Sequence, residues 1–274
     1  MISYLYSFLD EENNINAHFL EGTELINDFL KVHHFPPEGE IYFRQCIVSF
    51  VTTLCFLKTG ESIGFYVDSA EPYFRFKLEA NAQGQMRALL LPEDFGQIPS
   101  RITGVARLVK IIDQAKAPYT SIIDLKNNTF TEVINKFLSQ SYQVESSLHL
   151  SPSGDQALLL NKVPYKILKV KPVNLQEFWQ QRQESVLSLF SAQLYNLDKI
   201  QEAFRQLGFV YLGPRKMQFK CNCSQQRMLD NLRLLKATEK GNLFELDKDT
   251  LECRCDYCKT TYLINRQELD AVIN

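Results

Sequence analysis

The sequence of 274 residues lacks any long apolar stretch. No segment reaches the roughly 18 consecutive apolar residues that a membrane-spanning helix needs. Its first 22 residues, MISYLYSFLDEENNINAHFLEG, also lack the basic start, continuous apolar region and small-residue cleavage site of an export signal. The sequence therefore predicts a cytoplasmic protein that does not associate with membranes.

An excess of positive charge is missing as well. Lysine and arginine number 30 against 32 aspartates and glutamates, which gives a formal net charge of -2. Proteins that bind nucleic acid through its phosphates usually carry a clear basic excess. Nucleic acid is therefore not the expected partner of this chain.

Signals for catalysis are scarce. The sequence has no Gly-rich phosphate loop of the P-loop form, so no motif predicts that the protein uses ATP. Only four histidines occur, at His18, His33, His34 and His149, and each is expected to be an ordinary surface or boundary residue. We predict no catalytic residue, no enzyme activity and no bound nucleotide.

Cysteine is present in a distinctive pattern. Near the C-terminus, Cys221 and Cys223 form a Cys-x-Cys pair, and Cys255 and Cys258 form a Cys-x-x-Cys pair after 31 intervening residues. Four thiolates from two such pairs can hold one zinc ion in a closed tetrahedron, and the same sulfurs can be oxidised to two disulfides. Because reducing compartments disfavour structural disulfides, metal or redox chemistry is the expected role.

The two chemical states of four such cysteines exclude each other. Zinc–sulfur bonds of about 2.3 Å place neighbouring sulfurs roughly 3.8 Å apart, whereas a disulfide needs about 2.05 Å. Oxidation of either pair must therefore expel the ion, which can contribute on the order of 10 kcal/mol to the folding of a small module. A four-thiolate site also has no open coordination position, so zinc enzyme chemistry is not expected.

The first 165 residues or so mix helix and strand signals and predict an α+β domain. A buried helix is expected from Glu40 to Lys58, ending near Gly60, with Cys46 and Cys55 as core residues. A second helix is expected from Thr129 to Tyr142. Alternating stretches predict strands at Ser62 to Asp68, Tyr73 to Ala80, Gln85 to Leu91, Val105 to Ile112, Thr120 to Asp124 and Ser147 to Leu150.

Residues 169–218 are expected to form a helical linker. The pattern predicts helices from Leu175 to Leu194 and from Leu197 to Leu207, the second capped by Asn196 and ended by Gly208. An apolar stripe follows both helices and favours a hairpin packed on its own domain. Undocked, the same stripe would expose apolar surface, so its members are candidate client-binding residues. They are Trp179, Val186, Phe190, Leu194, Leu197, Ile200, Phe204 and Leu207.

Residues 219–274 are expected to form a small zinc domain. A module of this size needs metal to supplement its core. Nine basic and nine acidic side chains balance in it, which argues against a zinc-ribbon adaptor or nucleic-acid-binding protein. Two further alternatives are a purely structural zinc module and a thiol oxidoreductase, although Cys255 lies too near the C-terminus for a thioredoxin-like active site.

The C-terminal motif resembles that of the 33 kDa chaperonin family, a family of redox-switched holdase chaperones. The resemblance rests on FKCNCSQQR from Phe219 to Arg227 and on CDYC from Cys255 to Cys258, followed by Tyr262. It extends more weakly along the chain, for example through Phe137 to Gln143. It implies an α+β domain at 1–168, a helical linker at 169–218 and a zinc domain at 219–274.

The resemblance also implies a mechanism. One zinc ion per chain would be bound by Cys221, Cys223, Cys255 and Cys258 in the reduced, inactive protein. Oxidation would form Cys221–Cys223 and Cys255–Cys258 disulfides and release zinc. Disorder of the zinc domain and linker would then let the chain, often as a homodimer, bind unfolding or oxidatively damaged client proteins without ATP. A constitutive or heat-activated chaperone with structural zinc is the alternative.

The sequence departs from that family at Cys253, an additional thiol two positions before Cys255. Cys253 is either a spectator or a competing thiol that binds metal, resolves a sulfenic acid or scrambles the disulfides.

Overall fold

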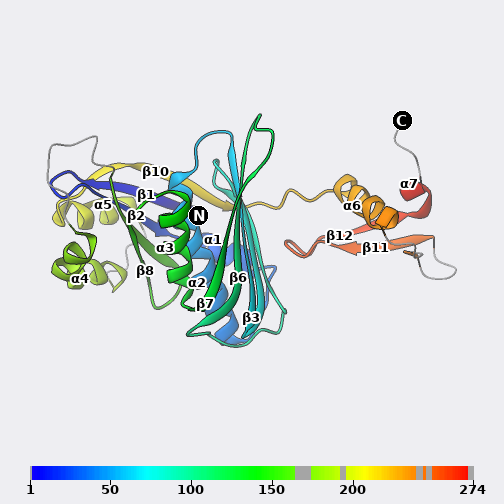
Figure 1. Cartoon of the computed structure of the whole chain (residues 1–274), viewed down its shortest axis with the longest axis horizontal. Coiled ribbons are helices and arrows are strands. Elements are labelled where there is room, and N and C mark those ends of the chain that lie inside the picture. The colour runs from blue at the N-terminus through cyan, green and yellow to red at the C-terminus, as the bar shows by residue number, and fades with distance from the viewer. Residues whose placement is uncertain (1, 164–173, 192–195, 239–242, 245–248, 271–274) are drawn as a thin grey trace. The chain divides into compact units, whose positions relative to one another are not determined.

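The computed structural model describes residues 2–163, 174–191, 196–238, 243–244 and 249–270. By their contacts they form two compact units, Met1–Phe219 and Lys220–Asn274 (Figure 1). The functional division at residues 168 and 218 stays a prediction. No helix of the described residues is long and apolar enough to cross a membrane.

The first unit contains a ten-stranded sheet in the order β7-β6-β3-β4-β5-β10-β1-β2-β9-β8. Neighbouring strands are antiparallel, except that β10 runs parallel to β5. The strands are β1 (Ser3–Asp10), β2 (Ile15–Glu21), β3 (Glu61–Glu71), β4 (Tyr73–Asn81), β5 (Gln85–Leu91), β6 (Ile102–Ile112), β7 (Tyr119–Asn128), β8 (Ser146–Leu150), β9 (Gln156–Lys162) and β10 (Val210–Phe219). With the helices below, they confirm the expected α+β class.

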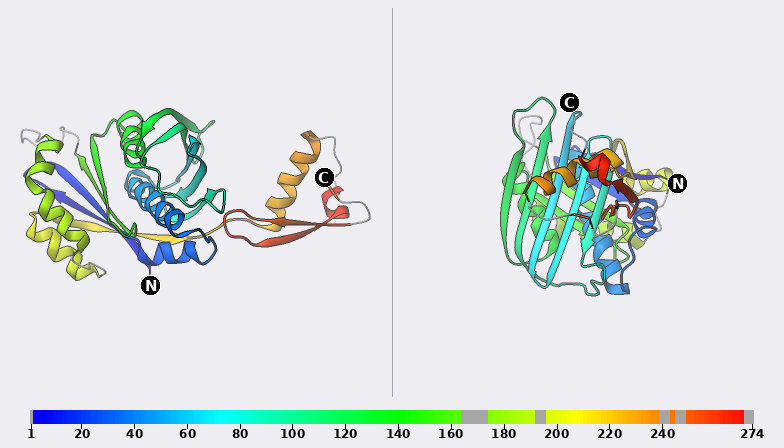
Figure 2. Two further views of the ribbon diagram at one scale, coloured as in Figure 1. Left: turned by 90° about the horizontal axis from the view of Figure 1, so that it is seen from below. Right: turned by 90° about the vertical axis from the view of Figure 1, so that its right-hand side faces the viewer.

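Helices cover both faces of the β1, β2 and β9 part of this sheet (Figure 2). The larger apolar core lies on one face, with α1 (Thr23–Leu30), α2 (Pro37–Val51), the 3₁₀ helix η1 (Thr52–Phe56) and α3 (Phe130–Ser141). A second core lies on the other face, beneath α4 (Leu175–Ser191) and α5 (Leu197–Gln206). Side chains alternate between the two faces along β1, so Leu5 joins the first core while Tyr6 and Phe8 join the second.

The helix expected from Glu40 to Lys58 is shorter than predicted. The α-helix ends at Val51, and a 3₁₀ turn follows. The hydroxyls of Thr52 and Thr53 donate to the carbonyls of Ser49 and Phe50, a side-chain bond that competes with the regular helix. Beyond this turn, the Arg215 guanidinium donates to the carbonyl oxygens of Leu54 and Leu57, which satisfies the end of the turn from outside.

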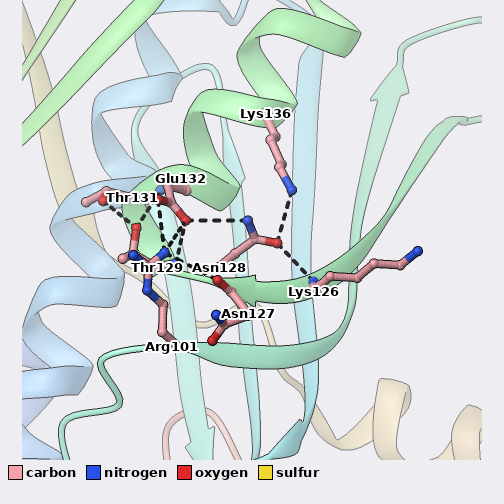
Figure 3. Close-up of polar contacts among 8 residues, drawn as sticks. All are labelled: Arg101, Lys126, Asn127, Asn128, Thr129, Thr131, Glu132 and Lys136. Carbon is pink, nitrogen blue, oxygen red and sulfur yellow. Dashed lines mark hydrogen bonds and ion pairs between the residues drawn. The ribbon is translucent and has the colours of Figure 1, made fainter.

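Helix α3 begins with the capping box that its sequence encodes. Thr129 accepts the backbone N–H of Glu132 through its hydroxyl, and the Glu132 carboxylate accepts the N–H of Thr129 (Figure 3). Arg101 pairs with Glu132 at 3.0 Å, and Lys136 donates to Asn128 at 3.0 Å. These contacts join α3 to β7 and to Arg101, the residue before β6, beside a surface cavity of about 570 Å³.

The second unit is built from α6 (Gln225–Thr238), the hairpin of β11 (Thr250–Arg254) and β12 (Thr261–Asn265), and α7 (Arg266–Asp270). Its buried apolar core consists of four described residues, Leu229, Phe244, Ile264 and Leu269. So small a core gives little stability by burial alone, which makes additional cross-linking of this unit important.

Candidate metal centre

Four cysteines of the second unit meet at one point. Cys221 and Cys223 lie just before α6, while Cys255 and Cys258 lie in the turn between β11 and β12. Their four sulfurs all lie within 4.8 Å of one another, and they form the cysteine cluster that could hold a metal ion among the described residues. The fold thus brings together the four thiols that the sequence singled out.

The turn that carries Cys255 and Cys258 is shaped by backbone hydrogen bonds. The N–H of Lys259 donates to the carbonyl of Cys255 at 2.8 Å, and the N–H of Cys255 donates to the carbonyl of Thr260 at 2.9 Å. Lys259 takes a left-handed conformation with φ 61°, which reverses the chain. This tight turn brings both sulfurs of the Cys-x-x-Cys pair to the same side.

One sulfur separation equals that of a tetrahedral zinc site, and a second is shorter. Sγ of Cys221 lies 3.8 Å from Sγ of Cys255, and Sγ of Cys223 lies 3.3 Å from Sγ of Cys258. Zinc–sulfur bonds of about 2.3 Å require sulfurs roughly 3.8 Å apart. Each of these two distances joins one sulfur of the Cys-x-Cys pair to one sulfur of the Cys-x-x-Cys pair.

The electrostatics of the cluster also favour a cation. Burial, with neighbouring thiols, raises the pKa of Cys223 to about 12. Burial acts in the same sense on Cys258, but hydrogen bonds with Thr260 and the adjacent thiols lower its pKa to about 7. Four sulfurs this close cannot all be negative unless a positive ion lies among them. An all-sulfur donor set of four suits zinc in a closed, structural site.

Two of the sulfurs each lie within hydrogen-bond distance of a hydroxyl group. The Tyr262 hydroxyl donates to Sγ of Cys223 at 3.1 Å. Sγ of Cys258 and Oγ1 of Thr260 are 3.2 Å apart, where the thiol donates when protonated and accepts when ionised. Sequence reasoning did not assign these two hydroxyls to the site, because nothing in the spacing shows that a hydroxyl reaches a sulfur.

The additional thiol, Cys253, stands apart from this cluster. It lies in β11 opposite Tyr262 and packs against the small apolar core. Burial raises its pKa. In this arrangement it behaves as a small apolar side chain rather than a fifth member of the cluster.

The thiols of the first unit, Cys46 and Cys55, have the core role that the sequence predicts. Cys46 is fully buried in the larger core, and Cys55 packs against it. Burial raises the pKa of both thiols, which keeps them protonated and unreactive.

The candidate client-binding stripe packs on the second core of the first unit. Ile200 and Phe204 are fully buried, and the Phe204 ring stacks on Phe8 with ring centroids 4.0 Å apart. Trp179, Phe190 and Leu207 are partly buried there, while Leu197 is 37% exposed. Leu194 and the side chain of Val186 lie outside the described residues.

Capping residues define the described ends of this helical segment. Asn196 accepts the N–H of Lys199 at 2.9 Å at the start of α5, and Gly208, with φ 86°, follows its end, as predicted. Trp179 of α4 stacks on His149 of β8 with centroids 3.4 Å apart. In the described residues the stripe is docked on its own domain, which is the first of the two arrangements expected for it.

Two of the four histidines differ from expectation. His18 and His33 are buried rather than at the surface. His18 accepts or donates a hydrogen bond with Ser7 at 2.9 Å beneath η1, and burial lowers its pKa to about 4. His18 is buried because β2 is covered on both faces, and His33 because its ring packs against Phe35 and Phe43.

One serine motif invites a hydrolase interpretation, which the fold does not support. Gly60-Glu61-Ser62-Ile63-Gly64 has the Gly-x-Ser-x-Gly spacing of a nucleophile elbow. That motif requires a sharp turn from a strand into a helix. Ser62 instead lies inside β3, paired with Asn81 and Ile111 of the neighbouring strands.

Similarity to known proteins extends along almost the whole chain. The model of the Hsp33 protein family matches residues 3–265. A 33 kDa chaperonin of Pectobacterium carotovorum is 24% identical, with 98% of this chain and 95% of that protein covered. A 33 kDa chaperonin of Geobacter sulfurreducens is 23% identical, with 97% and 93% covered.

A solved structure has the same fold. The crystal structure of the 33 kDa chaperonin (heat shock protein 33 homolog) of Thermotoga maritima superposes with a TM-score of 0.74 at 14% identity. The match covers 98% of this chain and 97% of that one. At this identity the likeness shows the fold alone.

Proposed function

From the premise that this chain belongs to the Hsp33 family, we propose that it is an ATP-independent holdase chaperone that oxidation activates. In the reduced protein Cys221, Cys223, Cys255 and Cys258 would hold one zinc ion. The observation that carries the proposal is the convergence of these four sulfurs in a unit with only a small apolar core. The zinc would cross-link the unit. Because four thiolates fill its coordination sphere, no position would stay open for water or a substrate.

Oxidation acts first on the zinc ligands, and the second unit loses stability as a consequence. For each pair, two thiolates lose two electrons to one hypochlorous acid molecule, which forms a disulfide, one chloride and one hydroxide. We propose the pairs Cys221–Cys223 and Cys255–Cys258. A sulfur bound to another sulfur at about 2.05 Å can no longer serve as a tetrahedral thiolate ligand, so the second unit loses its main cross-link.

Client binding would then use apolar surface of the linker helices. The described members of the stripe pack in or against the second core of the first unit, among them Trp179, Phe190, Ile200, Phe204 and Leu207. When α4 and α5 undock, these side chains and the face they cover become accessible to unfolded segments. No nucleotide is needed, because burial of apolar surface drives the association.

A comparison of reduced and oxidised protein tests this function. Aggregation of a heat-unfolded client is followed by light scattering while zinc release and free thiols are measured in the same sample. The expected result is strong protection only after both thiol pairs are lost. Equal protection before and after oxidation would favour the alternative, a constitutive or heat-activated chaperone with structural zinc.

Other classes give different outcomes. A thiol oxidoreductase would reduce insulin disulfides and lose this turnover in Cys255→Ser, and a nucleic-acid-binding zinc module would bind RNA or DNA in a salt-dependent manner. We expect neither. We further propose a reducing, cytoplasmic setting, and a homodimer as the active form, which sedimentation of the oxidised protein would detect.

A further inference from the structure

The hydroxyl of Tyr262 joins the two halves of the cysteine cluster. Tyr262 lies in β12, one strand of the hairpin whose turn carries Cys255 and Cys258. Its hydroxyl donates to Sγ of Cys223, 39 residues away in the segment before α6, at 3.1 Å. The bond therefore connects a ligand from one segment to the element that carries the other two.

Thr260 provides an internal contrast. Its Oγ1 lies 3.2 Å from Sγ of Cys258, only two residues away in the same turn. This contact stays within one segment. The sulfurs of Cys223 and Cys258 lie 3.3 Å apart. Each thus has a hydroxyl partner, which comes from the other segment for Cys223 and from the same turn for Cys258.

Tyr262 is also held in place by its surroundings. It pairs with Cys253 across the hairpin and packs beside the small core of the second unit. A side chain fixed in this way keeps its hydroxyl directed at Cys223 without a large entropic cost. The geometry is that of a partner to a metal ligand, which fixes the ligand and adjusts its electron density.

We propose that Tyr262 restrains oxidation of the Cys221–Cys223 half of the site through its hydrogen bond to Cys223. Tyr262 is a positioning residue here, since it acts through the sulfur. This inference rests on the proposed redox function and adds a regulator to it.

The chemistry gives the direction of the effect. In the first step a sulfur lone pair of Cys223 attacks the chlorine of hypochlorous acid, which forms a sulfenyl chloride and releases hydroxide. The second thiolate of the pair then displaces chloride and closes the disulfide. A donor hydrogen bond withdraws electron density from the attacking sulfur and so slows the first step, and partners of metal ligands commonly change affinity or activity 10- to 100-fold.

The test uses the full-length, reduced, metal-loaded chain and two matched hydroxyl deletions. Y262F removes the hydroxyl that reaches Cys223, and T260V removes the one that reaches Cys258, with little change in shape. Initial rates of modification at a limiting hypochlorite concentration are measured for each thiol by rapid alkylation and mass spectrometry. Cobalt-loaded samples give the sulfur-to-cobalt charge-transfer band as a readout independent of oxidation.

In Y262F we expect the initial rate at Cys223 to rise about tenfold, the rate at Cys258 to stay within twofold, and the cobalt band to move to longer wavelength. In T260V the faster thiol should be Cys258. A Y262F protein with the wild-type rate at Cys223 and the wild-type band would overturn the inference. Failure of the proposed function is distinguishable, since it appears as a lack of client protection by oxidised wild type.

Discussion

The two units of this chain are stabilised in different ways. The first unit buries two apolar cores rich in aromatic contacts, such as the Phe50–Phe65 stack with centroids 4.7 Å apart. The second buries four apolar side chains within its described residues and adds four converging sulfurs. Burial suffices for a large core but not for a small one, so only the second unit should depend on a chemical cross-link.

Metal removal should produce the largest difference in stability between the two units. Chelation of the reduced protein should abolish hydrogen-exchange protection in α6 and in the β11–β12 hairpin, because structural zinc contributes on the order of 10 kcal/mol in small modules. Strands β3 to β6 should keep their protection. Peptide-resolved hydrogen exchange measures both in one sample, and zinc addition should restore the signal. Full protection of the hairpin in metal-free protein would contradict the proposed dependence.

A cavity beneath the linker helices should weaken their docking without affecting the metal centre. Phe204 is 1% exposed and stacks on Phe8, so Phe204→Ala should cost about 3 to 5 kcal/mol. Exchange in α4 and α5 should accelerate, and the reduced variant should protect clients from aggregation. Zinc content should stay at the wild-type level.

Leu197→Ala is the control for that variant. Leu197 belongs to the same stripe but is 37% exposed, and its truncation should leave both exchange and client protection close to wild type. If Phe204→Ala releases the helices and the reduced protein still fails to bind clients, the linker surface is not the client-binding surface.

Acid should destabilise the first unit through His18. Burial lowers its pKa to about 4, whereas an unfolded histidine titrates near 6.5. The unfolded state thus binds more protons between these values, and the free energy of unfolding falls as pH drops through this window, by up to about 3 kcal/mol. Ser7, Asn161 and Arg215 face the ring, and none supplies a negative charge to offset protonation.

The pH dependence is measured as urea midpoints of β1, β2 and β9 by pulse-labelling exchange at pH 7 and pH 4.5. His18→Gln should show a smaller shift between the two values than wild type. Some shift should remain, because the pKa of His149 is also lowered to about 4 by burial. An identical shift in the variant would show that His18 does not carry the effect.

The smallest effect is expected at Cys253. Its side chain packs against the core of the second unit without joining the four-sulfur cluster. Cys253→Ala should therefore bind one zinc ion per chain and lose about 1 kcal/mol at most. Zinc stoichiometry and the disulfide map after oxidation check this, and a scrambled map in wild type that the variant corrects would identify Cys253 as a competing thiol.

How much of the fold is visible in the sequence depends on the environment of each strand. The predictions for β4 and β5 agree with the structure within a residue. Strands β1, β2 and β9 were missed. Most of their residues are buried on both faces of the sheet, and β9 has a continuous apolar stretch at residues 157–160 instead of the alternation of a half-buried strand.

Strand β10 was missed for another reason. Gly213 and Pro214 lie within it, and both residues argue against a strand interior. The structure tolerates Pro214 because β10 pairs with β5 only at Gln218 and Phe219, which leaves the proline on a stretch paired with β1 alone. The sheet arrangement that permits this is a tertiary property and has no local signal.

In the candidate site, too, some residues can be predicted from the sequence and others only from the tertiary structure. Cysteine spacing identifies Cys221, Cys223, Cys255 and Cys258 directly, because few other patterns bring four thiols together. Tyr262 and Thr260 are ordinary strand and turn residues by sequence. Their contacts to sulfur depend on the hairpin register and on where the segment before α6 lies.

The dependence of the second unit on its thiolate-bound metal is tested most directly by a hypochlorite titration of the full-length reduced protein. Released zinc and hydrogen exchange of residues 220–270 are recorded together. We expect both to change at the same oxidant dose, while β3 to β6 remain protected. Complete disulfide formation that leaves the exchange of α6 and the β11–β12 hairpin unchanged would contradict this dependence.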